Sequence, residues 1–238
     1  MASTVKVFIL AGGLGTRIRP LFPDCPKPLI PFHGKPFLQW QIELLAKQGF
    51  QEFVLCIGYL SEQIVEQFGD GSSLGVKIEY SIESTPLGTG GALKHAAKSI
   101  DHTIMLVNGD TYLNTNYVEL VSRHQELVKR EHAIGSMSLV HRQDTDRYGS
   151  VTLTETSQLA QFQARSPDLV PGLVNAGAYI FEPQILDFIP TNQQTSLESD
   201  IFPQIIKNHQ NLYGISIEGT FIDMGTVDGY EQLLTELK

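Results

Sequence analysis

Glycine, arginine and lysine residues gather just after an apolar run near the start of the chain. The run covers residues 5–10 (VKVFIL) and continues into residues 11–17 (AGGLGTR), and Lys27 follows between two prolines. Glycine lets backbone N–H groups turn toward a bound anion, and arginine can grip two phosphate oxygens at once. Arg17, Arg19, Lys27 and the glycines therefore predict a phosphate-binding loop at the end of a buried strand.

Two common phosphate-binding motifs do not fit this loop. Counted from Gly12, the sixth position of a P-loop is occupied by Arg17, and no Gly-Lys-Ser/Thr sequence follows. The dinucleotide-binding fingerprint fails as well, because its third glycine would fall on Ile18. The loop is therefore typical neither of a P-loop kinase nor of a Rossmann dehydrogenase.

The elements that must position this loop follow from hydrophobic periodicity and from glycine and proline punctuation. Residues 11–36 form a long loop whose apolar side chains predict that it is ordered. We expect helices at residues 37–48, 62–68, 92–98, 116–130, 185–188, 201–207 and 229–237. We expect strands at residues 5–10, 53–57, 76–82, 103–107, 133–140, 151–153, 160–162, 174–181, 212–217 and 220–223.

Strands and helices alternate up to about residue 147, and strands dominate from Tyr148 onward. Such alternation predicts an α/β fold, with a Rossmann-like, mainly parallel mixed sheet that has helices on both faces. The later strands predict a small antiparallel lobe. We expect a single domain, residues 1–238, made of halves 1–147 and 148–238. Ligands of parallel sheets bind at the carboxyl ends of the strands, where the glycine-rich loop and Asp110 both fall.

Composition narrows the functional classes. The 238 residues are 42% hydrophobic and carry a net charge of −9, which argues against a nucleic-acid-binding protein. No apolar run reaches the roughly 18 residues that a membrane span needs, and no secretory leader is visible, so the expectation is a cytoplasmic protein. Cys25 and Cys56 have no Cys-X-X-Cys partner and are expected to be free thiols.

The loop, together with residues 26–29 (PKPL), resembles the opening motif of the sugar-1-phosphate nucleotidyltransferases. Further matching segments occur in order along nearly the whole chain: residues 83–92 (ESTPLGTGGA), 108–110 (NGD), 147–151 (RYGSV), 174–177 (VNAG) and 221–225 (FIDMG). The form of residues 83–92 is most similar to the guanylyl-transferring members, which act on mannose 1-phosphate or D-glycero-D-manno-heptose 1-phosphate. The later half would then hold the sugar phosphate.

The resemblance implies that a nucleoside triphosphate, expected to be GTP, reacts with a sugar 1-phosphate to give a nucleotide sugar and pyrophosphate. The attacking phosphate has a second pKa of about 6, so it is already ionised at neutral pH and needs no general base. Positioning and charge neutralisation would then be the task of the protein. The implied catalytic residues are Arg17, Lys27, Asp110 and Asp223, with Mg²⁺ held by Asp110 and Asp223.

The resemblance also assigns binding residues. Those expected to bind the nucleotide are Leu10, Ala11, Gly12, Gly13, Gly15, Thr16, Glu83, Gly88 and Thr89. Those expected to bind the sugar phosphate are Tyr148, Gly149, Arg165, Asn175, Gly177 and Glu198. The chain departs from the family where Ala164 and Arg165 replace the usual Glu-Lys, and where Val227 replaces a frequent proline.

Other interpretations remain open. Each aspartate could be a helix cap or turn former, and Arg17 could be a surface ion-pair residue. The domain could be a non-catalytic regulatory subunit, or an enzyme that transfers uridylyl or cytidylyl groups to another acceptor. The presence of Arg17, Lys27, Asp110 and Asp223 together favours a catalytic protein over a non-catalytic subunit. The sequence contains no hexapeptide repeat, so no C-terminal β-helix is expected. Any homo-oligomer is therefore expected to use the surface of this domain.

Overall fold

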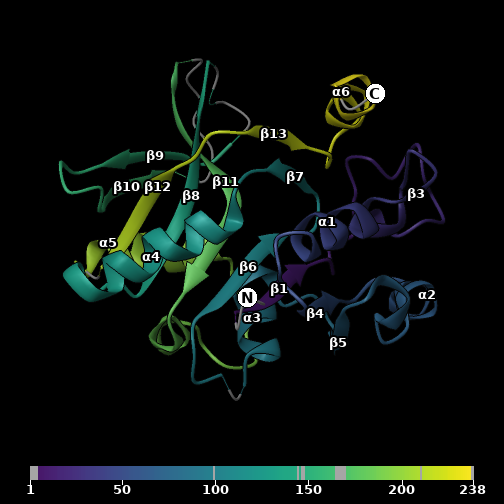
Figure 1. Cartoon of the computed structure of the whole chain (residues 1–238), viewed down its shortest axis with the longest axis horizontal. Helices are drawn as coiled ribbons and strands as arrows, with labels where there is room; N and C mark the ends of the chain where they lie inside the picture. Colours follow the sequence, from purple (N-terminus) through teal and green to yellow (C-terminus); the bar gives the residue numbers. More distant parts are fainter. Residues whose placement is uncertain are drawn as a thin grey trace. The chain divides into compact units, whose positions relative to one another are not determined.

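The computed structural model describes residues 5–98, 100–143, 145, 148–163, 170–209 and 211–236 (Figure 1). The chain divides into two compact units that are discontinuous in sequence. The first contains residues 1–86, 107–114 and 219–238, and the second contains residues 87–106 and 115–218. Strand β6 (Ile104–Asn108) begins in the second unit and ends in the first, so the chain passes between the units within one strand.

Three parallel strands form the centre of the first unit: β1 (Lys6–Leu10), β4 (Glu52–Ile57) and β5 (Lys77–Ile82). Their apolar side chains are almost fully buried in β1 and β4, as a continuous apolar run predicts. The register pairs Leu10 with Cys56 and Cys56 with Ser81, so the carboxyl ends of the three strands lie together. The predicted parallel arrangement and its common edge are confirmed.

Short elements occupy the long loop that follows β1. They are η1 (Lys27–Leu29), β2 (Pro31–Phe32) and β3 (Lys35–Pro36), and helix α1 (Phe37–Ala46) follows directly. Phe32 and Phe37 are buried in a cluster with Ile222 and Met224 from the end of the chain. The loop is therefore ordered, as its apolar residues predict. Helix α2 (Ser61–Phe68) and the turn η2 (Ser72–Leu74) complete the segment between β4 and β5.

The first unit also contains a two-stranded antiparallel ribbon of β7 (Thr111–Asn114) and β13 (Thr220–Asp223), followed by helix α6 (Val227–Glu236). The register places Asp223 opposite Thr111, the neighbour of Asp110. Strand β7 is absent from the sequence-based assignment, because its four residues directly after a turn carry too short a pattern to recognise. This ribbon joins two segments that are far apart in the sequence.

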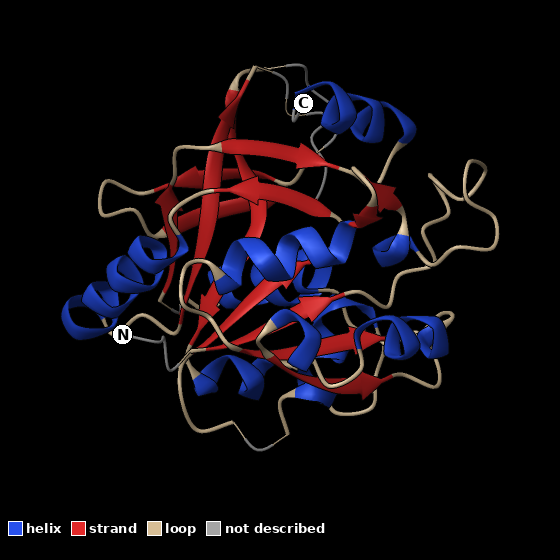
Figure 2. Ribbon diagram, turned by 45° about the vertical axis from the view of Figure 1, so that its right-hand side comes forward, coloured by secondary structure: helices blue, strands red, loops and turns tan. Residues whose placement is uncertain are grey.

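The second unit contains a sheet ordered β10–β9–β11–β8–β12, in which only β12 runs parallel to its neighbour. Figure 2 draws the strands in red and the helices in blue. Its strands are β8 (Gly135–Arg142), β9 (Ser150–Leu153), β10 (Leu159–Gln163), β11 (Gly172–Phe181) and β12 (Leu212–Ser216). Its helices are α3 (Gly88–Ala96), α4 (Tyr117–Glu131), η3 (Pro183–Phe188), η4 (Leu197–Ile201) and α5 (Phe202–Lys207). The predicted mixed α/β class with an antiparallel part is confirmed.

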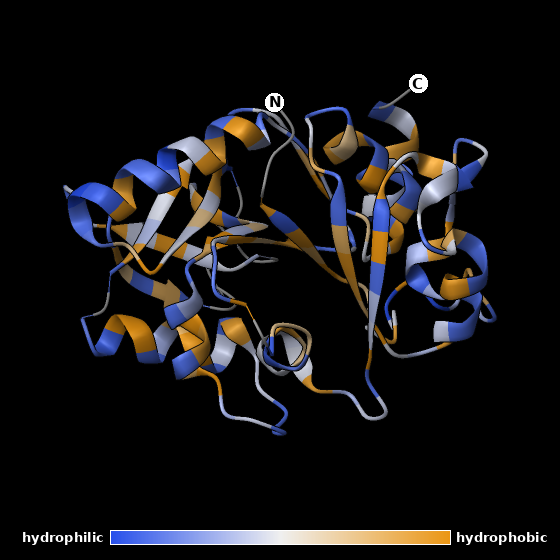
Figure 3. Ribbon diagram, turned by 60° about the horizontal axis from the view of Figure 1, so that its bottom comes forward, coloured by the Kyte–Doolittle hydropathy of each residue, from blue (hydrophilic) through white to orange (hydrophobic). Residues whose placement is uncertain are grey.

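Helix α3 begins at Gly88, four residues earlier than predicted. The glycines between residues 88 and 91 suggest a loop, but the N–H groups of Gly90 and Gly91 both donate to the Thr195 carbonyl, at 2.8 and 3.1 Å. A Cβ at Gly88 would lie 2.6 Å from the same carbonyl oxygen. Close packing, rather than chain flexibility, thus accounts for these glycines. Figure 3 shows that the helices carry both hydrophobic and hydrophilic residues, as amphipathic helices do.

No helix in the described part of the chain is long and apolar enough to cross a membrane. Both cysteines are free thiols, as predicted, and Cys56 is fully buried in β4.

His124, on α4, is fully buried in the second unit, where its Nδ1 lies 2.7 Å from the Ser136 hydroxyl and its Nε2 3.2 Å from Glu182. Burial lowers the pKa of His124 below the ordinary 6.5, although the Glu182 carboxylate opposes this shift. A histidine that stays neutral in the folded state but gains a proton when unfolded makes unfolding easier in acid. We therefore expect its stabilising contribution to be complete above pH 6.5 and to be lost as the pH falls toward the lowered pKa.

The measurement is urea denaturation of the wild type between pH 5 and 8. The His124→Gln variant should lose part of the wild-type decline below pH 6.5, whereas His95→Gln, on α3, should keep it. An identical decline in His124→Gln and wild type would contradict the assignment.

Candidate active site

The four charged residues predicted to be catalytic all belong to the first unit. Arg17 lies in the loop after β1, Lys27 begins η1, Asp110 lies in the turn between β6 and β7, and Asp223 ends β13. Lys27 Nζ forms an ion pair with Asp110, and Arg17 Nη1 lies 3.7 Å from Asp223 Oδ2. The Lys27 side chain is 10% exposed, whereas Arg17 is 53% exposed. The structure thus brings together residues from four separate segments.

Gly225 shows how closely three of these groups approach one another. A Cβ at this position would lie 2.6 Å from Lys27 Nζ, 2.7 Å from Asp223 Oδ1 and 3.0 Å from Arg17 Nη2. The Gly225 N–H donates to Asp223 Oδ1 at 2.8 Å, which holds the carboxylate in place. The missing side chain therefore leaves a small space bordered by two cations and a carboxylate. The sequence motif contains this glycine, but its role as the wall of the site is visible only in the structure.

The two aspartates differ in their electrostatic environment. Burial would raise the pKa of Asp110, but attraction to Lys27, a hydrogen bond from Lys27 and attraction to Arg17 hold it below the ordinary value. Burial and the negative charge of Asp110 raise the pKa of Asp223, against the smaller opposing effects of Gly225, Lys27 and Arg17. The site therefore holds two mutually repelling carboxylates, and at Asp223 the nearby positive charges do not outweigh burial and this repulsion.

This environment fits a divalent cation. Mg²⁺ prefers hard oxygen ligands and is commonly bound through one or two carboxylates together with substrate phosphates. Within the described residues, no group of three or more His, Cys, Asp or Glu side chains is placed to hold a metal on its own. Asp110 and Asp223 would be the protein's ligands, and phosphate oxygens would have to complete the set.

Most of the predicted nucleotide-binding residues lie at the carboxyl edge of the β1–β4–β5 sheet: Leu10, Ala11, Gly12, Gly13, Gly15, Thr16 and Glu83. The Ala11 N–H donates to Cys56 O at 2.8 Å, and the Glu83 N–H donates to Ile57 O at 2.9 Å. A Cβ at Gly12 would lie 3.4 Å from the Gly58 nitrogen, so the two loops touch through their backbones. Gly13 and Thr16 are exposed. The loops that follow β1, β4 and β5 thus lie at the same edge of the sheet.

Arg19 belongs to the predicted phosphate-binding loop but is not among the residues assigned to catalysis or binding, and it is held by Tyr59. Its Nη2 donates to the Tyr59 hydroxyl at 2.8 Å, and its guanidinium carbon lies 5.0 Å from the centre of the ring. In the sequence, the only indication of a role for Arg19 is its position two residues after Arg17. In this structure Arg17 lies beside Asp223, whereas Arg19 is hydrogen-bonded to Tyr59.

The predicted residues Gly88, Thr89 and Glu198 lie together in the second unit. Thr89 Oγ1 donates to Glu198 Oε2 at 2.6 Å and accepts from the Leu197 N–H at 2.8 Å. Ser196 Oγ donates to the same carboxylate oxygen at 2.9 Å. These bonds tie the start of α3 to η4. Glu198 is thereby fixed, with Oε2 engaged in hydrogen bonds.

Asn175 and Gly177 lie in β11 where its pairing with β8 is interrupted by a register shift. Asn175 Oδ1 accepts from the Gly177 N–H at 2.9 Å, its Nδ2 donates to the Tyr179 hydroxyl at 2.6 Å, and Gly177 has φ of +73°. Gly149 O accepts from the Asn175 N–H at 2.8 Å. Such bulges often redirect side chains next to functional sites.

Of the other predicted sugar-phosphate residues, Tyr148 lies next to Gly149, and the Arg142 guanidinium carbon is 5.6 Å from the centre of its ring. Arg165 and its neighbour Ala164 lie outside the described residues.

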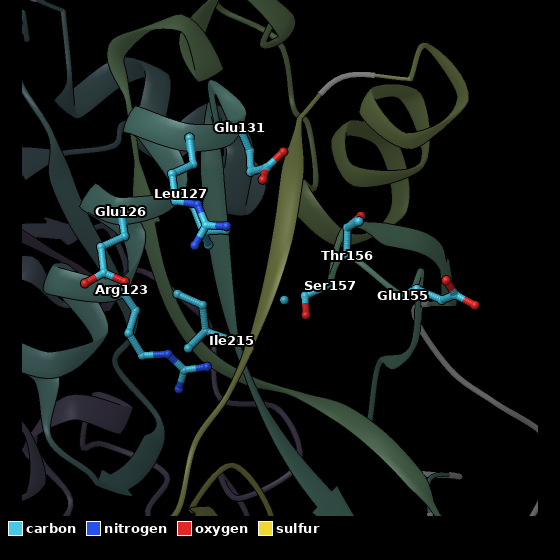
Figure 4. Close-up of a pocket in the computed structure, with 10 residues that line it drawn as sticks. Arg123, Glu126, Leu127, Glu131, Glu155, Thr156, Ser157 and Ile215 are labelled. Carbon is cyan, nitrogen blue, oxygen red and sulfur yellow. The ribbon is translucent and has the colours of Figure 1, made fainter.

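A pocket of about 330 Å³ lies within the second unit between α4, the turn from β9 to β10, and β12 (Figure 4). Arg123 and Glu131 line it from α4, and Glu155 and Ser157 line it from the turn. Cations and carboxylates are mixed along its walls, which favours no single class of ligand. None of the predicted site residues lines this pocket.

The matching family model describes a nucleotidyl transferase and covers residues 6–238. D-glycero-alpha-D-manno-heptose 1-phosphate guanylyltransferase of Campylobacter jejuni is 34% identical over 232 residues, which are 97% of this chain and 99% of the relative. Mannose-1-phosphate guanylyltransferase of Mycobacterium tuberculosis is 33% identical over 228 residues, which are 95% of this chain. The chain spans 62% of the length of that relative, and also 62% of a Synechocystis UTP–glucose-1-phosphate uridylyltransferase, to which it is 31% identical over 245 residues, 97% of this chain.

Solved structures agree with these relatives. The crystal structure of HddC from Yersinia pseudotuberculosis has a TM-score of 0.86 and 30% sequence identity, and the comparison covers 99% of this chain and 100% of that chain. The same protein complexed with GMP-PN has a TM-score of 0.85, with the same identity and coverage. Because the family match extends over almost every residue and these relatives are at least 30% identical to the chain, the chain belongs to the nucleotidyl transferase family.

Proposed function

We propose that this protein transfers a guanylyl group from GTP to the 1-phosphate of a manno-configured sugar, such as D-glycero-D-manno-heptose 1-phosphate or mannose 1-phosphate. The convergence of Arg17, Lys27 and Asp223 around Gly225, with Asp110 paired to Lys27, is the observation that carries the proposal. The heptose and mannose relatives support the choice of base and sugar.

In the proposed reaction, a sugar-phosphate oxygen forms a new bond to the α-phosphorus of GTP, and the bond between that phosphorus and the bridging oxygen to the β-phosphate breaks. Pyrophosphate leaves with the bonding electrons, and the products are GDP-sugar and pyrophosphate. No proton has to be removed from the nucleophile at neutral pH, because its second pKa is about 6. The protein therefore acts by aligning the reactants and compensating their charge.

The geometry suggests a role for each charged residue. Arg17, the most exposed of the four, can reach the leaving pyrophosphate with a bidentate grip. Lys27 is mostly shielded from solvent beside Asp110 and supplies a fixed positive charge near the α-phosphate. Asp110 and Asp223 would hold Mg²⁺, which when bound supplies charge neutralisation and orients phosphate oxygens. Gly12, Gly13 and Gly15 let the nucleotide approach the backbone.

The second half of the chain, residues 148–238, would hold the sugar phosphate. Asn175 and Gly177 at the β11 bulge, Glu198 behind Thr89, and Tyr148 with Gly149 are the residues that we assign to it. Arg165 would grip the phosphate as a planar fork, in place of the lysine usual in the family. The nucleotide-binding role would fall to residues 1–147 and the sugar-binding role to residues 148–238.

The test is a matrix of GTP, UTP, CTP and ATP against a panel of sugar 1-phosphates, with pyrophosphate release measured in the presence of Mg²⁺. We expect the highest kcat/KM with GTP and a manno-configured 1-phosphate, and loss of turnover when EDTA removes the metal. Higher kcat/KM with UTP or CTP would favour uridylyl or cytidylyl transfer instead. Absence of turnover across the whole matrix would support a regulatory subunit.

A further inference from the structure

Gln41 is the polar exception on the buried side of helix α1. The other buried residues of this helix are all apolar: Phe37, Leu38, Ile42 and Leu45. Gln41 is 7% exposed. Burying an amide is unfavourable unless its polar atoms form hydrogen bonds, so a glutamine on this face requires an explanation.

The Gln41 side chain spans the turn that carries Asp110. Its Nε2 donates to the Asn108 carbonyl at 2.9 Å and to the Thr111 carbonyl at 2.7 Å. These two carbonyls lie on either side of Gly109 and Asp110. One amide nitrogen with two hydrogens therefore ties together the last residue of β6 and the first residue of β7.

Two further hydrogen bonds fix the same turn from other elements. The Gly109 N–H donates to Leu10 O at 2.9 Å, and the Met224 N–H donates to Asp110 O at 2.9 Å. A Cβ at Gly109 would lie 2.6 Å from Leu10 O, so the turn is pressed against the end of β1. The backbone around Asp110 is thus held by α1, β1 and the residue after β13.

The value of Gln41 lies in its nitrogen rather than its oxygen. Within the described residues, Gln41 Oε1 is buried and has no hydrogen-bond partner. An apolar residue would avoid that unsatisfied acceptor, but it would remove the donor that the carbonyls of Asn108 and Thr111 share. Glutamate has the right length but would aim a carboxylate oxygen at the carbonyls, and asparagine is one methylene shorter.

We propose that Gln41 is a positioning residue for Asp110, which acts by holding the two carbonyls on either side of the Gly109–Asp110 turn. Its effect on turnover rests on the proposed function, whereas its effect on the turn does not. Gln41 touches no reacting atom. It determines where the carboxylate of Asp110 stands relative to Lys27 and Asp223.

The experiment compares Gln41→Met with Leu45→Met, which places the same side chain on another buried position of α1. Amide hydrogen exchange, resolved by NMR on the whole chain, should become at least about 10-fold faster at Gly109 and Met224 in Gln41→Met. Amides of β4 should keep their wild-type rates, and Leu45→Met should leave all these rates unchanged. Gln41→Glu keeps the side-chain length and should show the same faster exchange at Gly109 and Met224. It replaces Gln41→Met in the experiment if that variant does not fold.

Kinetics provide the second readout. We expect kcat to fall about 10- to 100-fold in Gln41→Met, with KM for both substrates within about threefold, because a misplaced ligand affects the transition state more than substrate binding. Unchanged exchange at Gly109 and Met224 would overturn the proposal, as would faster exchange throughout the chain or faster local exchange with unchanged kcat. If the wild type turns over no substrate pair, the proposed function fails, while the exchange rates still decide the role of Gln41.

Discussion

Replacing Asp110 by asparagine should lower kcat of guanylyl transfer by about 10³-fold. The carboxylate of Asp110 is held ionised by Lys27 and Arg17, so at neutral pH it presents a full negative charge in the site. Asparagine has nearly the same shape but no charge, and it leaves the buried ammonium of Lys27 without its partner. The loss should appear in kcat, and in the Mg²⁺ concentration needed for half-maximal rate, which should rise.

The matched control is Asp187→Asn, which removes an exposed carboxylate from η3 and should retain wild-type kinetics. Steady-state assays over a Mg²⁺ series, together with a thermal melt of each variant, separate a catalytic effect from unfolding. Turnover of Asp110→Asn within tenfold of the wild type, in a folded protein, would show that Asp110 does not serve the reaction.

Replacing Gly225 by alanine should lower kcat by about 10²-fold, because small displacements of aligned groups cost about that much. The added Cβ would stand 2.6 Å from Lys27 Nζ and 2.7 Å from Asp223 Oδ1, closer than non-bonded contacts allow. The two charged side chains must move apart, and each then leaves its place around the phosphates. The fold should survive, since the adjacent strand β13 and helix α6 keep their own contacts.

Gly172→Ala is the appropriate control for this variant. Among the described residues, a Cβ at Gly172, at the start of β11, would meet only Thr145 Cγ2, at an ordinary 3.4 Å. We expect it to match the wild type in kcat and in melting temperature. If Gly225→Ala also kept the wild-type kcat, the space beside Gly225 would not be part of the reaction site.

The sequence was most informative where local pattern and function coincide. The apolar run of β1 ends at glycines, and parallel strands end at a common edge, so the position of the glycine-rich loop at that edge could be predicted from residues 5–17. The shift to an antiparallel second half was predictable for a similar reason, since strands without intervening helices pair with their neighbours. Each of these predictions uses residues that are close together in the chain.

The arrangement of the site depends on contacts that no local pattern contains. Asp223 reaches Asp110 through the pairing of β13 with β7, and β7 itself was not predicted. Gly225 has no side chain, so only its neighbours show that it borders the site. Gln41 carried a weak signal, a polar residue among the apolar positions of α1, but its partners Asn108 and Thr111 could not be identified without the structure.

The pairing of β7 with β13 also has a consequence for the newborn protein on the ribosome. Strand β7, which follows Asp110, is synthesised before residues 115–218 of the second unit. Thr220–Asp223 is synthesised only after them. Until those residues leave the exit tunnel, Asp110 and Lys27 are present without Asp223 or Gly225, and the ribbon cannot close. In a nascent chain, Asp223 and Gly225 can therefore join Asp110 and Lys27 only after the whole second unit has been synthesised.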